Sequence, residues 1–148
     1  MAASSARTAS SLAAARHSHA RLAAAVHNLD RALAMPAVEP TWTTRVRGAL
    51  NALRPAFALH VDTTEGPDGL HGEILDREPR LAHQATVLVR EHAVIAATMD
   101  ALAERLGTVP PDLIRAWAVD LLRELSRHRQ RGADLLYEAF ETDIGGEN

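Results

Sequence analysis

Two histidine-centred segments contain the side chains of this sequence that are best suited to bind a metal ion. In residues 53–75, LRPAFALHVDTTEGPDGLHGEIL, an apolar helical run leads to His60, and an acid and a glycine follow. Residues 121–140, LLRELSRHRQRGADLLYEAF, bring a similar run to His128, again followed by a glycine and an acid. The repeated order predicts two helices that face each other across one polar site.

Each of the four apolar helical stripes in the sequence contains one histidine. A single histidine on such a stripe is usually a core residue hydrogen-bonded to a neighbour. Four rings that converge in one core need a shared partner, because a buried polar ring without a partner costs free energy. Imidazole nitrogen is a good ligand for iron, zinc and copper, and bundle cores commonly hold such metals. The pattern therefore predicts a metal site built from His19, His60, His92 and His128.

Two acids are candidate ligands beside these histidines. Glu65 follows His60 by five residues, and Asp134 follows His128 by six. A regular α-helix would turn both acids more than about 100° away from their histidines. The glycine in each segment allows local unwinding that could bring the acid back. Both Glu65 and Asp134 are therefore included in the predicted site.

The other candidate residues fit the stripes less well. His27 competes with His19 for the first helix, and we favour His19. His71 could approach the site only if the turn after Glu65 reverses the chain. Tyr137 could stand behind the ligands, although core packing is the simpler expectation. The remaining histidines and acids of interest are expected on solvated faces, namely His17, His83, Glu73 and Glu138.

Apolar residues at alternating three- and four-residue spacing predict the helices that position these side chains. We expect long helices at about 8–35, 42–65 and from 79 to Gly107, a fourth from Pro111, and a short one at 70–76. Pro55 should kink the second helix or delay its start. Mostly short connections predict an all-α, up-down-up-down four-helix bundle. The expected organisation is a disordered N-terminus at 1–8, the bundle at 9–140 and a flexible tail at 141–148.

Composition narrows the function classes. Apolar residues make up 47% of the 148 residues but aromatic residues only 3%, which favours closely packed helices rich in alanine and leucine. The net charge of −3 and the lack of a basic stripe argue against nucleic-acid binding. The absence of cysteine excludes disulfides and thiolate metal sites. No apolar run approaches the length of a membrane span, so we expect no membrane association and a cytoplasmic protein.

The pattern resembles the hemerythrin-like (HHE cation-binding) family, as a divergent member. The most similar segments are REHAVIAATMDAL at 90–102 and the two histidine–acid runs described above. The resemblance implies a four-helix bundle with a non-haem di-iron centre. It also implies oxygen binding, sensing, or chemistry on peroxide or nitric oxide. The ligands that it implies are His19, His60, Glu65, His92, His128 and Asp134.

The sequence departs from the family pattern at two points. Leu88 stands where the third helix of typical members has a second histidine. Each histidine-to-acid spacing is one residue longer than the family's. One ion, or another transition metal, is therefore an alternative to two irons.

Two classes of function remain open from the sequence. The first is a metal-binding bundle, with iron as the expected metal and dioxygen or another small oxidant as partner, acting as an enzyme or as a carrier or sensor. The second is a structural helical module that binds a protein partner without metal. A homodimer is compatible with either class, and metal content would separate the two.

Overall fold

The chain folds into helices throughout the part that the structure describes. The structure is a computed structural model that describes residues 2–38, 40–66 and 68–141. Four long helices are present, α1 (Ala2–Ala34), α2 (Trp42–Glu65), α4 (Ala82–Arg105) and α5 (Pro111–Leu136). Short elements complete the order, namely α3 (Leu70–Arg77), the 3-10 turn Pro79–Leu81 and the π-helical turn Tyr137–Glu141. The predicted all-α four-helix bundle is confirmed.

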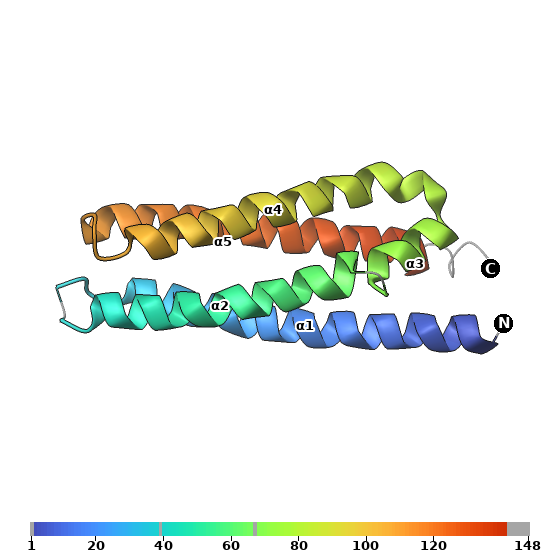
Figure 1. Ribbon diagram of the computed structural model, residues 1–148, viewed down its shortest axis with the longest axis horizontal. Coiled ribbons are helices and arrows are strands. Elements are labelled where there is room, and N and C mark those ends of the chain that lie inside the picture. Colours follow the sequence, from blue (N-terminus) through green and yellow to red (C-terminus); the bar gives the residue numbers. More distant parts are fainter. Residues whose placement is uncertain (1, 39, 67, 142–148) are drawn as a thin grey trace.

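The four long helices form two neighbouring pairs. In Figure 1, α1 lies beside α2 and α4 beside α5, with the α1–α2 and α4–α5 connections at the same end of the molecule. The short helix α3 lies at the opposite end, where the chain crosses from one pair to the other. This crossing is the longest interruption between the long helices.

Two helix boundaries differ from the sequence-based predictions. Helix α1 begins at Ala2 and therefore includes residues 2–8, for which disorder was predicted. Its first turns are rich in alanine, a strong helix former, and Thr8 donates a 2.9 Å hydrogen bond to Glu73 of α3. Helix α2 runs unbroken from Trp42 through the exposed Pro55 to Glu65, so Pro55 does not delay its start. Residues 142–148 of the predicted tail lie outside the described residues.

Buried apolar side chains form two clusters along the bundle axis. The larger one includes Leu22, Leu53, Phe57, Ile95 and Leu125 and extends toward the α1–α2 and α4–α5 connections. The smaller one, which we call the α3 cluster, is built around Leu70, Ile74, Leu81, Ala85, Leu88, Leu135, Ala139 and Phe140. The stripe histidines of α2, α4 and α5 lie in sequence between members of the two clusters. They therefore form a polar layer between two apolar ones.

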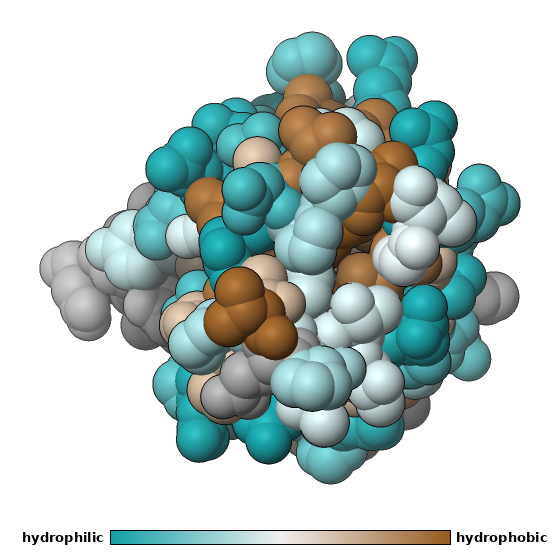
Figure 2. Space-filling view, turned by 90° about the vertical axis from the view of Figure 1, so that its left-hand side faces the viewer, coloured by the Kyte–Doolittle hydropathy of each residue, from teal (hydrophilic) through white to brown (hydrophobic). Residues whose placement is uncertain are grey.

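Hydrophilic residues cover much of the end of the bundle that Figure 2 shows. This view looks onto the end with the α1–α2 and α4–α5 connections, where the hydrophobic residues gather mainly in the upper part. Within the described residues, no helix combines the length and the hydropathy needed to cross a membrane.

Candidate metal centre

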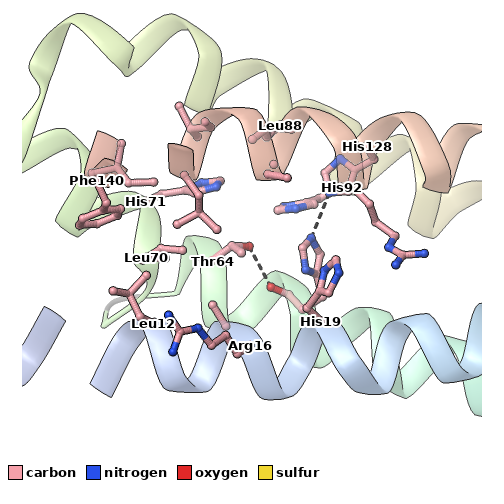
Figure 3. Close-up of a pocket in the computed structure, with 18 residues that line it drawn as sticks. Leu12, Arg16, His19, Thr64, Leu70, His71, Leu88, His92, His128 and Phe140 are labelled. Atoms are coloured by element: carbon pink, nitrogen blue, oxygen red, sulfur yellow. Dashed lines mark hydrogen bonds between the residues drawn. The ribbon is translucent and has the colours of Figure 1, made fainter. Parts of the chain in front are cut away.

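Three of the four stripe histidines meet at one level of the bundle. One ligating nitrogen from each of His60, His92 and His128 lies within 4.8 Å of the others. The Nε2 atoms of His60 and His128 are 3.0 Å apart, and Figure 3 marks this contact. The ring centroids of the three pairs are 4.7 to 5.2 Å apart. This three-histidine cluster is close enough to hold one metal ion.

Helix geometry explains why α2, α4 and α5 place their histidines together. Each histidine continues the buried stripe of its own helix, so its ring must point into the core. The Phe57 ring, one turn before His60, lies beneath all three imidazoles, with ring centroids 5.7 to 6.2 Å away. Phe57 is thus the part of the larger apolar cluster that contacts the three histidines.

Two of these imidazoles contact a carboxylate through Nδ1, the ring nitrogen other than Nε2. His92 Nδ1 lies 3.0 Å from Glu65 Oε2, and His128 Nδ1 lies 3.0 Å from Glu91 Oε1. Arg131 in turn forms an ion pair with Glu91. An Nδ1–H that donates to a carboxylate leaves the Nε2 lone pair available, and this arrangement is common behind metal-bound histidines. His92 and His128 are therefore oriented as ligands through Nε2.

Glu65 reaches the site by a route that the sequence did not predict. Helix α2 stays helical to Glu65, so an acid five residues after His60 points away from that histidine and toward α4. Its carboxylate contacts the imidazole of His92 and acts there as an orienting partner.

Asp134, the second predicted acid, is not brought to the cluster. Helix α5 continues through Gly132 to Leu136 without unwinding, so Asp134 stays turned away from His128. Its side chain is exposed and accepts a 3.0 Å hydrogen bond from Gln130. Within the described residues, Asp134 therefore supplies no bridge to a second ion.

The remaining candidates divide according to the cavity beside the cluster. His19 lines this cavity, although it is largely exposed on α1, whereas His27 is exposed and does not line it. His71 also lines it, because the turn after Glu65 lets α3 fold back over the site. The His71 ring is buried and stacks on His92 with a centroid distance of 6.1 Å. Leu88, at the position of the missing family histidine, is buried in the cavity wall.

Sequence reasoning missed Glu91 and gave His71 a conditional role only. Glu91 directly precedes His92, so helical geometry points it about 100° away from that ring and toward α5. The only available signal was the acid–histidine dipeptide itself, which does not reveal a partner on another helix. The approach of His71 to the site depended on a reversal of the chain after Glu65, which the sequence alone does not establish.

Burial keeps the imidazoles of His60 and His92 neutral. Loss of hydration, together with the charges of neighbouring histidines, lowers the pKa of His60 and that of His92 to about 3. Burial also lowers the pKa of His71 and that of His19, the latter helped by Arg129. Neutral imidazole is the form that binds a metal ion, so His60 and His92 can act as ligands at neutral pH.

The cavity opens from the three-histidine cluster toward α3. It has a volume of about 480 Å³. Its walls combine the histidines, Thr64, Arg16 and Arg129 with apolar side chains of the α3 cluster and α1, as Figure 3 shows for several of them. An ion held by the cluster would have one side facing this cavity and the other side facing Phe57.

No protein-family model, curated protein or solved structure matches this chain. Three imidazoles, two of them bonded to carboxylates, with a cavity on one side, can bind a transition-metal ion and present an open coordination position.

The lowered pKa values predict acid sensitivity of the metal-free protein. The pKa values of His60 and His92, about 3, lie below the ordinary value of 6.5. Between these two values the unfolded chain therefore binds more protons than the folded chain. Stability should therefore be full above about pH 6.5 and fall as the pH drops toward 3. Between pH 7 and pH 5 we expect His60 alone to lower the free energy of unfolding by up to about 2 kcal/mol, measured by urea titration of chelator-treated protein.

A variant pair controls this pH experiment. His60→Leu should reduce the difference in stability between pH 7 and pH 5, because it removes a ring whose pKa is lowered in the folded chain. His83→Leu should leave the difference unchanged, because His83 is exposed on α4. An equal pH dependence in wild type and His60→Leu would contradict the prediction.

Proposed function

We propose that this protein is a metal-binding four-helix bundle that holds one transition-metal ion at His60, His92 and His128. The single observation that carries the proposal is the convergence of these three imidazoles beside an open cavity. Iron is the metal we expect, and dioxygen, peroxide or nitric oxide the partner, as the resemblance to the hemerythrin-like family implies. When bound, the ion would supply an electron-exchanging centre for a small oxidant.

One pair of nitrogens in the cluster has almost the spacing of two ligands of one metal ion. Two imidazole ligands of a tetrahedral ion with metal–nitrogen distances of about 2.0–2.1 Å have their nitrogens roughly 3.3 Å apart. The His60 and His128 Nε2 atoms are 3.0 Å apart, so small side-chain movements suffice. The fit supports one ion. A second ion would need bridging carboxylates, but Glu65 is bonded to His92 and Asp134 is exposed.

The chain's own residues have separate tasks in this proposal. Glu65 and Glu91 hold the protons of His92 Nδ1 and His128 Nδ1 and so fix the ring orientations. Phe57 keeps water from the core side of the cluster. Leu88 fills the place of a further ligand with an apolar side chain, which keeps a coordination position open to the cavity.

A metal-free structural role is the second candidate. The observation that favours it is the 3.0 Å contact between His60 Nε2 and His128 Nε2, which can be a hydrogen bond between the two rings. In that case the histidines would form a satisfied polar layer in a module that binds a protein partner. A metal-free structural role does not explain the cavity or the hydrogen bond between Glu65 and His92.

The metal content of the purified protein tests the proposal. The protein should be expressed in iron-supplemented medium without a histidine tag, since a tag would bind metal itself. We expect about one ion per chain by mass spectrometry of the metals, and a lower melting temperature after chelation, because the metal binds only the folded state.

The outcomes of the metal measurement have distinct meanings. Zinc in place of iron would keep the site but remove the proposed redox chemistry. Protein that contains no transition metal, and whose melting curve is unchanged by chelator or by added iron, would favour the structural module.

A further inference from the structure

The cavity beside the three-histidine cluster is larger than a small oxidant requires. Its volume of about 480 Å³ falls in the range of pockets that bind organic molecules, roughly 300–1,000 Å³. A molecule the size of dioxygen needs little more room than a water, which takes up about 30 Å³ in the liquid. The wall on the side of α3 is apolar, formed by Leu12, Leu70, Ile74, Leu136 and Phe140. Such a wall suits an apolar molecular body.

The charged side chains of the cavity wall are all cationic. Arg16 from α1 and Arg129 from α5 line it, and among the described lining residues no aspartate or glutamate is present. Neither arginine forms an ion pair within the described part of the chain, and Arg129 Nε is buried without a hydrogen-bond partner. An unpaired guanidinium in a largely apolar pocket favours a negatively charged ligand group.

His71 provides a second unsatisfied polar group in the same wall. It is 7% exposed, and its Nδ1 atom is buried without a hydrogen-bond partner. In Figure 3 its ring lies between Phe140 and the three-histidine cluster. Leaving a buried polar atom unpaired costs about 1–3 kcal/mol, so a ligand that bonds to it would offset that cost.

We propose that this cavity binds an amphipathic organic monoanion, namely a carboxylate attached to an apolar chain or ring. Its charged group pairs with Arg129, and its apolar body packs against Leu12, Leu70 and Phe140. The inference rests on the proposed function where it makes this anion the substrate of the metal centre. Binding of the anion to the cavity can be tested on protein with or without metal.

Calorimetric titration with octanoate tests the inference, with octan-1-ol as the uncharged probe of the same length. We expect octanoate to bind at least about tenfold more tightly than octan-1-ol, which is the effect of one charge-assisted pair of about 1.4 kcal/mol. Arg129→Gln should remove this preference and leave octan-1-ol binding unchanged. The matched control is Arg127→Gln, because Arg127 is exposed on the same helix and does not line the cavity.

A steric variant provides an independent test of the location. A Cβ atom at Gly132 would meet no atom within 4 Å, and Gly132 lines the cavity. Gly132→Leu should therefore fold, fill part of the cavity and abolish binding of both probes. Gly48→Leu is the control, because Gly48 is also helical and unobstructed but lies outside the cavity.

The outcomes separate this inference from the proposed function. Titrations are run on metal-loaded and on chelator-treated protein, and the metal content of each variant is measured. Octanoate binding to a protein that never takes up metal would overturn the metal centre and keep the anion site. Full metal content with equal binding of octanoate and octan-1-ol, or with octanoate binding unaffected by Gly132→Leu, would overturn the anion site alone.

Discussion

His92→Ala and His128→Ala should each lower the affinity for the metal ion by more than about 100-fold. The expected loss exceeds the 10–100-fold typical of outer-shell partners, because each variant removes one of three direct nitrogen donors. The purified variants should contain almost no metal, and chelator should no longer change their melting temperatures. Titration of chelator-treated protein with iron or zinc, followed by determination of the bound metal, gives the measurement.

Exposed histidines provide the control for these variants. His17→Ala and His83→Ala should retain the wild-type metal content, because both residues lie on solvated faces of α1 and α4. His128→Gln keeps most of the buried volume, so it separates loss of a ligand from the cavity that alanine leaves. If His92→Ala or His128→Ala retains wild-type affinity while it stays folded, the three-histidine site is wrong.

Glu91→Ala and Glu65→Ala should each weaken metal binding by about 10–100-fold without removing the site. The expected cause is the loss of the acceptor at His128 Nδ1 or His92 Nδ1, which leaves the ring free to rotate or change tautomer. Arg131→Ala should have a smaller effect, since Arg131 acts on His128 only through Glu91. Competition with a chromogenic chelator would measure these affinities.

Asp134→Ala is the matched control for the two acids. Asp134 is exposed and bonded to Gln130, so its loss should leave metal content and optical spectrum unchanged. If Asp134→Ala instead releases one of two bound ions, the protein holds the di-iron centre that the resemblance implies, and the single-ion proposal is wrong.

The helices and the histidines on their buried faces follow from the amino-acid sequence alone. An apolar stripe at three- and four-residue spacing is a local property, because the helical repeat determines which side chains share a face. His60, His92 and His128 are therefore predictable as inward-facing residues. The same reasoning predicts that His17 and His83 are exposed, and both are exposed in the folded chain.

Packing between the helices determines which of these side chains meet. The axial stagger of the helices depends on packing across the whole bundle, and it brings three histidines to one level while His19 stays at the edge of the cavity. The partners of the acids depend on neighbouring helices, so Glu65 bonds to His92 on α4 and Glu91 to His128 on α5. Asp134 stays in solvent because α5 does not unwind at Gly132. These contacts join residues that are far apart in the sequence. A helical repeat is a local pattern, so it does not determine them.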